Sequence, residues 1–159
     1  MAKFTAKQIL THPIHFLAFG FGSGLSPKAP GTVGTIAAVP IYFYLSALSL
    51  EYYLMVCVFV SLIGIVICGK SAKLLSTHDH PGIVWDEFAG FFITMIAVPL
   101  SWQNILLGFI FFRLFDIFKP WPISWLDKQV DGGLGIMVDD IIAGFFSLVC
   151  IHLVINYLL

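Results

Sequence analysis

Four long, strongly apolar stretches of this sequence contain no Asp, Glu, Lys or Arg, and they constrain the fold more than any other feature. The stretches cover residues 33–50, 52–69, 88–112 and 141–159. A helix that crosses a bilayer needs about 20 predominantly apolar residues. Only 11% of the chain is charged, whereas a soluble domain has about 25%, so these residues could not cover a water-facing surface. We therefore predict a helical membrane protein with a single domain over residues 1–159.

The third stretch is long enough to form two helices. Its middle, residues 99–104, reads Pro-Leu-Ser-Trp-Gln-Asn, which is typical of a turn. Each half must then take residues from its flank to reach a spanning length. The short, glycine-rich segment 14–25 is predicted to be an interfacial or re-entrant piece. The expected fold is all-α and polytopic, with about five spanning helices near residues 33–50, 52–69, 83–101, 103–119 and 141–159.

The basic residues indicate how these helices would be oriented. With five spans, every Lys and Arg falls on one side of the membrane, and the opposite loops, around residues 51 and 101–104, have none. The positive-inside rule makes the charged side cytoplasmic. The net charge of −1 provides no basic surface for nucleic acid, and no obligate protein partner is evident.

A short internal repeat places acidic pairs at the start of two apolar segments. Asp86-Glu-Phe-Ala-Gly-Phe-Phe92 matches Asp140-Ile-Ile-Ala-Gly-Phe-Phe146, and Asp139 completes the second pair. Small residues such as Gly90 and Gly144 allow two helices to pack backbone to backbone. Such packing would bring four carboxylates together, which requires a compensating cation, and oxygen ligands suit Mg²⁺. The alternative is that these residues are solvated helix caps.

Arg113, Asp116 and Lys119 are spaced three apart, which predicts one helical face. Asp116 could join the metal cluster or hold its neighbours in place, and the two basic side chains could face a phosphate. The alternative is a salt-bridge ladder that neutralises itself. All three residues would lie on the cytoplasmic side, with the acidic pairs.

Two glycine-rich segments complete the pattern. Residues 22–35 contain four glycines, four hydroxyl side chains and Lys28, and they precede an apolar helix. Backbone N–H groups at such a helix start can bind an anion, although a flexible interfacial loop is the alternative and no Walker A pattern is present. Residues 132–135 are expected to form a tight loop before the second acidic pair, with Asp131 either a ligand or a turn residue. The segment His78-Asp-His80 is expected to be a solvated loop.

These motifs resemble the phosphatidylglycerophosphatase A family from end to end. The resemblance lies in four blocks that occur in order, at residues 28–35, 84–90, 112–122 and 132–144. It implies a Mg²⁺-dependent hydrolase of the bacterial inner membrane, with its active site on the cytoplasmic side. The implied reaction removes the terminal phosphate of phosphatidylglycerophosphate, a phospholipid of the bilayer, to leave phosphatidylglycerol.

The expected site combines the residues of these motifs. The predicted metal ligands are Asp86, Glu87, Asp139 and Asp140, and Asp116 joins them as a catalytic residue. The predicted substrate-binding residues are Lys28, Thr32, Thr35, Arg113 and Lys119.

Two other functions are compatible with carboxylates at a membrane. A transferase that uses CDP-alcohols would need an Asp-Gly-x-x-Ala-Arg run followed by spaced Asp residues, and this sequence lacks that run. A small ion carrier would place charges near the middle of the bilayer on several helices, whereas here they are predicted to lie at one end.

Overall fold

The computed structural model describes residues 5–77 and 80–157, and all regular secondary structure in this part of the chain is helical. The all-α prediction is therefore confirmed. The elements, in chain order, are α1 (Ala6–Thr11), α2 (Pro13–Ala18), the 3₁₀ helix η1 (Gly20–Leu25), α3 (Pro30–Leu45), α4 (Leu50–Leu74), α5 (Trp85–Thr94), α6 (Trp102–Phe118), α7 (Ile123–Gln129) and α8 (Gly132–Tyr157).

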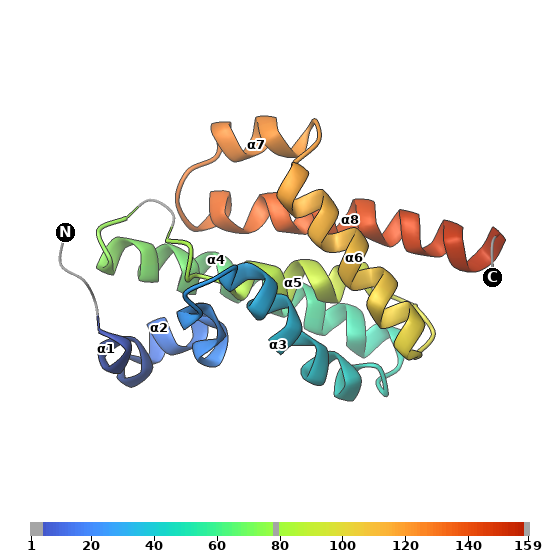
Figure 1. Cartoon of the computed structure of the whole chain (residues 1–159), viewed down its shortest axis with the longest axis horizontal. Coiled ribbons are helices and arrows are strands. Elements are labelled where there is room, and N and C mark those ends of the chain that lie inside the picture. The colour runs from blue at the N-terminus through green and yellow to red at the C-terminus, as the bar shows by residue number, and fades with distance from the viewer. Residues whose placement is uncertain (1–4, 78–79, 158–159) are drawn as a thin grey trace.

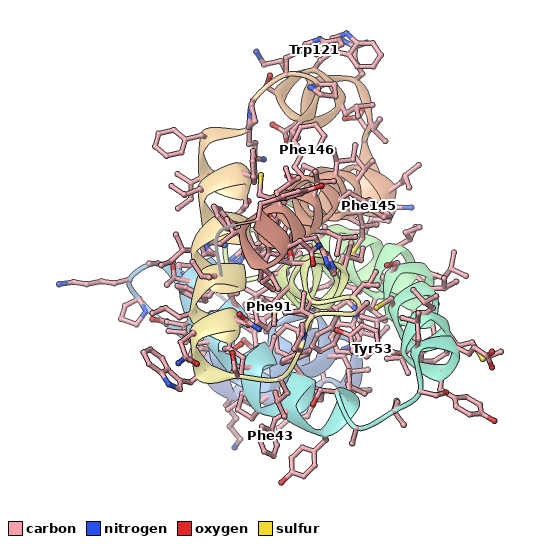
Figure 2. The ribbon with its side chains drawn as sticks, turned by 90° about the vertical axis from the view of Figure 1, so that its right-hand side faces the viewer. Phe43, Tyr53, Phe91, Trp121, Phe145 and Phe146 are labelled. Atoms are coloured by element: carbon pink, nitrogen blue, oxygen red, sulfur yellow. The ribbon has the colours of Figure 1, made fainter. Side chains whose placement is uncertain are left out.

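Helix α5 lies at the centre of the bundle, and α8 is its most extensive neighbour. The other long helices, α3, α4 and α6, also contact α5. Figure 1 shows that α3, α5 and α8 begin toward the same end of the bundle, where α4 and α6 finish. Figure 2 shows Phe91 of α5 inside the bundle and Trp121, before α7, at its outer tip. This arrangement gathers five helix ends in one region.

Helix α5 is shorter than the span predicted over residues 83–101, and this is a correction. It has ten residues, which is about 15 Å of helix against a hydrocarbon core of about 30 Å. Every residue from Glu87 to Thr94 is buried. The apolar run that predicts a spanning helix thus forms a short helix that other helices cover.

Side chains from neighbouring helices bind the carbonyl groups where α5 ends. The last carbonyls of a helix have no partner within it. The Tyr53 hydroxyl of α4 donates to the Phe92 carbonyl at 2.8 Å, and Nε2 of His152 in α8 is 2.9 Å from the Ile96 carbonyl. Ala97 adopts a left-handed conformation, with φ of 56°. The tertiary structure thus stabilises a short helix that ends in the protein interior.

Two helices in the described part of the chain, α4 and α8, are long and apolar enough to cross a membrane. They have 25 and 26 residues, whereas the apolar helix α3 has 16. These lengths suggest that the protein associates with a membrane. The five-span topology and its orientation stay predictions.

The predicted interfacial or re-entrant segment, residues 14–25, forms most of α2 and all of η1. Helix α2 packs against α4, and η1 packs against α3. His15 of α2 is buried, and its Nδ1 is hydrogen-bonded to the Ser71 hydroxyl at 2.8 Å. Burial lowers the pKa of His15, and the nearby His12 and His80 lower it further. The segment is thus anchored to the end of α4.

Candidate active site

Three carboxylates from two helices meet at the end of the bundle where α5 begins. Asp86 and Glu87 lie in the first turn of α5, and Asp140 lies in α8. Each residue offers one oxygen, and these oxygens all lie within 4.8 Å of one another. Only 9% of Glu87 and 2% of Asp140 is exposed, so these residues are not solvated helix caps. We call Asp86, Glu87 and Asp140 the carboxylate triad.

The carboxylate triad fits a divalent cation. Three like charges at this separation and burial cannot all ionise unless a positive charge compensates them. Asp86 Oδ1 and Glu87 Oε2 are buried and have no hydrogen-bond partner among the residues that the structure describes. Buried carboxylate oxygens normally have partners, and a metal ion would supply one. A donor set made only of oxygens suits a hard cation such as Mg²⁺.

Close packing of α5 on α8 determines the spacing of the carboxylate triad. A Cβ atom added to Gly144 would lie 2.6 Å from the Gly90 carbonyl oxygen, and one added to Gly90 would lie 2.7 Å from the Asp140 carbonyl oxygen. The Thr94 hydroxyl donates to the Gly90 carbonyl of its own helix at 2.9 Å, and it lies 3.5 Å from the Gly144 carbonyl of α8 across the contact. The predicted glycine contact between the two acidic helices is therefore confirmed.

Helix α6 adds a positive charge and a fourth carboxylate to this region. Arg113 Nη1 is 2.5 Å from Asp116 Oδ2 and 3.7 Å from Glu87 Oε1. Asp116 also lies beside Asp140. Arg113 therefore partly neutralises the acidic cluster, and Asp116 connects the triad to that arginine. Arg113 Nε is buried and has no hydrogen-bond partner among the described residues, so the side chain retains donor capacity.

Lys119 does not continue the helical face of Arg113 and Asp116, and this is a correction. Helix α6 ends at Phe118, and Lys119 caps it in a left-handed conformation, with φ of 41°. Its Nζ donates to Asp139 Oδ2 at 2.6 Å and to Asp127 Oδ1 at 3.0 Å. Asp139, predicted as a metal ligand, thus lies outside the carboxylate triad and is ion-paired with Lys119. The sequence does not indicate that Asp127 of α7 pairs with Lys119, because the two residues are eight apart and belong to different helical segments.

The glycine-rich segment 132–135 is not a loop. It forms the first turn of α8, so the second acidic pair lies inside a helix rather than after a turn. A Cβ atom added to Gly133 would lie 2.9 Å from the Gly69 backbone nitrogen, which means that these glycines allow α8 to begin against α4. Asp131 precedes this turn and is exposed, outside the carboxylate triad.

The start of α3 packs directly on the acidic cluster. A Cβ atom added to Gly31 would meet Glu87 Oε1, and it would lie 3.2 Å from both terminal nitrogens of Arg113. The predicted anion-binding segment therefore does reach the carboxylates. Lys28 precedes this helix and is exposed, and Thr32 is half-buried in its first turn.

Thr35 is placed differently from the other predicted substrate-binding residues. It is fully buried, and its hydroxyl donates to the Gly31 carbonyl of its own helix at 3.0 Å. Its contacts are therefore with the protein interior. His78 and Asp79 of the predicted solvated loop lie outside the described residues, and Nδ1 of His80 accepts from the Gly82 N–H at 3.0 Å.

Comparison with known proteins identifies the family of this chain. The family model for phosphatidylglycerophosphatase A matches residues 16–155. The chain is 48% identical to the phosphatidylglycerophosphatase A of Escherichia coli K12 over 139 residues, which is 87% of this chain and 81% of that protein. It is 43% identical to the phosphatidylglycerophosphatase A of Haemophilus influenzae Rd over 155 residues, which is 96% of this chain and 95% of that protein. No solved structure matches the chain. By both the family model and these relatives, the chain belongs to the phosphatidylglycerophosphatase A family.

Proposed function

We propose that this protein hydrolyses the terminal phosphomonoester of phosphatidylglycerophosphate, with Mg²⁺, to give phosphatidylglycerol and inorganic phosphate. The names of the two relatives support the substrate. The carboxylate triad supports the metal dependence. Two of its buried oxygens have no hydrogen-bond partner among the described residues. The three carboxylates would repel the substrate phosphate, so a cation must bind to them before the phosphate can approach.

Asp86, Glu87 and Asp140 would hold the cation. When bound, Mg²⁺ would supply positive charge that stabilises the charge developing on the phosphate oxygens. Asp116 and Arg113 would position the triad from α6, because they contact each other and the triad. Asp139 would contribute to the same active site, because it is next to Asp140 in α8 and forms an ion pair with Lys119.

The substrate phosphate would be bound between the starts of α3 and α5 and the end of α6. Arg113 retains an unused donor at Nε, and an ammonium group has three donors, of which Lys119 uses two for carboxylates. The N-terminus of α3, with Thr32 in its first turn and Lys28 before it, favours negative charge. Thr35 would act by stabilising this first turn, because its hydroxyl binds the Gly31 carbonyl.

We propose that the whole chain is one domain of the bacterial inner membrane, crosses it several times and has its active site on the cytoplasmic side. Two observations support this placement: α4 and α8 are long and apolar enough to cross, and Lys70 and Lys73 lie at the end of α4 that Figure 1 places with the start of α8. Acyl chains of the substrate would then remain in the bilayer.

The direct test is phosphate release from phosphatidylglycerophosphate by the purified protein, with Mg²⁺ and with a chelator. We expect release with Mg²⁺ and almost none with the chelator. If the protein instead joins a CDP-alcohol to a lipid acceptor, the transferase alternative would replace this proposal. Ion flux through reconstituted vesicles without phosphate release would favour the carrier.

We expect Lys119→Ala to raise the KM for the lipid substrate about 10-fold or more, because a hydrogen bond to a charged group contributes roughly 1.5–3 kcal/mol. The Mg²⁺ concentration for half-maximal rate should change little, because Lys119 contacts Asp139 and Asp127 rather than the carboxylate triad. Steady-state kinetics with substrate and Mg²⁺ varied separately measure both quantities.

Asp127→Asn is the matched control for Lys119→Ala. The substitution weakens the ion pair between Lys119 and Asp127, and the Asp127 side chain is 41% exposed. Exposed ion pairs contribute about 0–1 kcal/mol to stability. Its effect on KM should therefore be smaller. A larger shift in Mg²⁺ dependence than in KM for Lys119→Ala would show that Lys119 acts on the metal site instead.

A further inference from the structure

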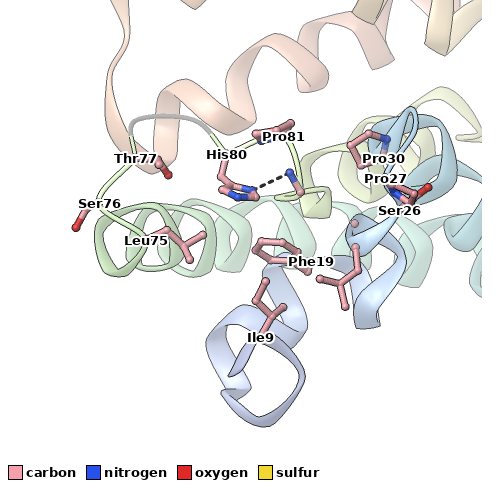
Figure 3. Close-up of a pocket in the computed structure, with 13 residues that line it drawn as sticks. Ile9, Phe19, Ser26, Pro27, Pro30, Leu75, Ser76, Thr77, His80 and Pro81 are labelled. Atoms are coloured by element: carbon pink, nitrogen blue, oxygen red, sulfur yellow. Dashed lines mark hydrogen bonds between the residues drawn. The ribbon is translucent and has the colours of Figure 1, made fainter. Parts of the chain in front are cut away.

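The N-terminal part of the chain and the end of α4 line a pocket that the proposed chemistry does not use. This pocket has a volume of about 760 Å³. Its walls come from α1, from η1 and the segment that follows it, from the end of α4 and from residues 80–82. Figure 3 shows Leu75, Ser76 and Thr77 on one side and Ser26, Pro27 and Pro30 on the other. We call it the N-terminal pocket.

The N-terminal pocket shares two segments with the acidic cluster. Pro30 lines the pocket, and a Cβ atom on the next residue, Gly31, would meet Glu87 and Arg113. Gly82 also lines the pocket, four residues before Asp86 in the sequence. A ligand whose phosphate is held at the carboxylate triad could therefore extend directly into the pocket.

The lining of the N-terminal pocket is suited to an anionic group attached to an apolar one. Ile9, Phe19 and Leu75 provide apolar walls, and none of the described residues that line it is acidic. The Thr77 hydroxyl is buried and has no hydrogen-bond partner among the described residues. A buried hydroxyl without a partner is costly, and a ligand oxygen would supply the partner.

His80 adds a donor to the N-terminal pocket, and Lys28 is next in the chain to a residue that lines it. Nδ1 of His80 accepts from the Gly82 N–H at 3.0 Å, so a neutral His80 ring carries its proton on Nε2 and is a donor there. Lys28 is exposed and lies in the chain between Pro27 and Pro30, which both line the pocket. The His80 donor can therefore bind an anionic oxygen inside the pocket.

We infer that the N-terminal pocket binds the phosphodiester and the central glycerol of the lipid substrate while the terminal phosphate lies at the carboxylate triad. The inference rests on the proposed function. Phosphatidylglycerophosphate carries this second, internal phosphate between its terminal phosphate and its acyl chains. A simple lipid phosphate such as phosphatidic acid has no such segment, so the pocket would select against it.

The test uses two inhibitors that separate the two sites. Phosphatidylglycerol keeps the phosphodiester and lacks the terminal phosphate. Inorganic phosphate is the product released at the cation-loaded triad, and it lacks the glycerol and acyl groups that would hold it in the pocket. In Thr77→Val we expect the inhibition constant of phosphatidylglycerol and the KM of the substrate to rise about tenfold, the effect of losing one hydrogen bond to a charged group. The inhibition constant of inorganic phosphate should not change.

Two variants make this result specific to hydrogen bonding. Thr77→Ser keeps the hydroxyl and should recover most of the affinity for phosphatidylglycerol that Thr77→Val loses. His80→Asn can keep an acceptor for the Gly82 N–H and removes the Nε2 donor, so it should weaken phosphatidylglycerol selectively as well. Circular dichroism of each variant in detergent checks that the helices remain.

Equal changes in both inhibition constants, or no change for phosphatidylglycerol in Thr77→Val and His80→Asn, would overturn the inference. If the proposed function is wrong, the unmodified protein will release no phosphate, and this result is distinct from any effect of the variants. In that case calorimetric binding of short-chain phosphatidylglycerol to the unmodified protein and to Thr77→Val still decides whether the pocket binds the phosphodiester: weaker binding by the variant supports it, and equal binding overturns it.

Discussion

Asp140→Asn is expected to lower kcat at least about 10²-fold, because it removes a ligand charge from the proposed cation site. Asp140 is 2% exposed and lies with Asp86 and Glu87 in the carboxylate triad. Asparagine keeps the side-chain size, so loss of packing would not explain the result. Asp86→Asn and Glu87→Gln should behave in the same way. Phosphate release at saturating substrate measures kcat, and Mn²⁺ binding followed by electron paramagnetic resonance measures the cation site directly.

The control for these substitutions is Glu51→Gln, which removes an acidic charge from the first turn of α4. Glu51 is exposed and belongs to the opposite end of α4 from Lys73. Its substitution should leave kcat and Mn²⁺ binding unchanged. Full activity in any two of the three triad variants would refute the assignment of the triad as a metal site.

Gly144→Leu is expected to leave the protein inserted in the membrane and to reduce its rate about 10²-fold, because a displacement near 1 Å in a catalytic group can have that effect. A Cβ atom at this position would lie 2.6 Å from the Gly90 carbonyl oxygen and 3.1 Å from Ile93 Cβ. Backbone cannot rotate away as a flexible side chain can, so α8 must move relative to α5. That movement would carry Asp140 away from Asp86 and Glu87.

Two further substitutions make the test of Gly144 specific. Gly144→Ala adds only the Cβ atom and should give an intermediate rate. Phe145→Leu alters the adjacent residue of α8, which is 50% exposed, and should retain the normal rate. The membrane fraction of each variant measures insertion, and phosphate release measures activity. If Gly144→Leu keeps the normal rate, contact between the two glycines does not determine the spacing of the carboxylate triad.

Asp139 and Asp140 show where prediction from the sequence stops. Both are acidic and adjacent and are predicted as metal ligands, although only Asp140 matches Asp86 in the internal repeat. Neighbouring residues on a helix point in different directions. The structure turns Asp140 toward α5 and Asp139 toward Lys119. The direction depends on how α8 is rotated against its neighbours, which is a property of packing.

Lys119 and the run after Asp86 illustrate two other kinds of error. The spacing of Lys119 predicted a continuous helix, but α6 ends before it, and α7 folds back so that Asp127 becomes its partner. The apolar run predicts one spanning helix over residues 83–101, whereas α5 has ten residues and other helices cover it. Apolar side chains are about equally stable against lipid tails and against other helices, so hydropathy alone does not distinguish a lipid-facing helix from one that other helices cover.

The sequence by itself determined the helical class, the acidic pairs and the glycine contact that joins them, because these depend on residue type and on spacing along a helix. Long uncharged stretches require helices in a bilayer, and the matching offset of Gly90 and Gly144 from the acidic pairs places both on one side of their helices. Only the tertiary structure decided which carboxylates meet, where α5 ends and that Thr77 and His80 line the N-terminal pocket. These features depend on contacts between segments far apart in the chain, and no local pattern records such contacts.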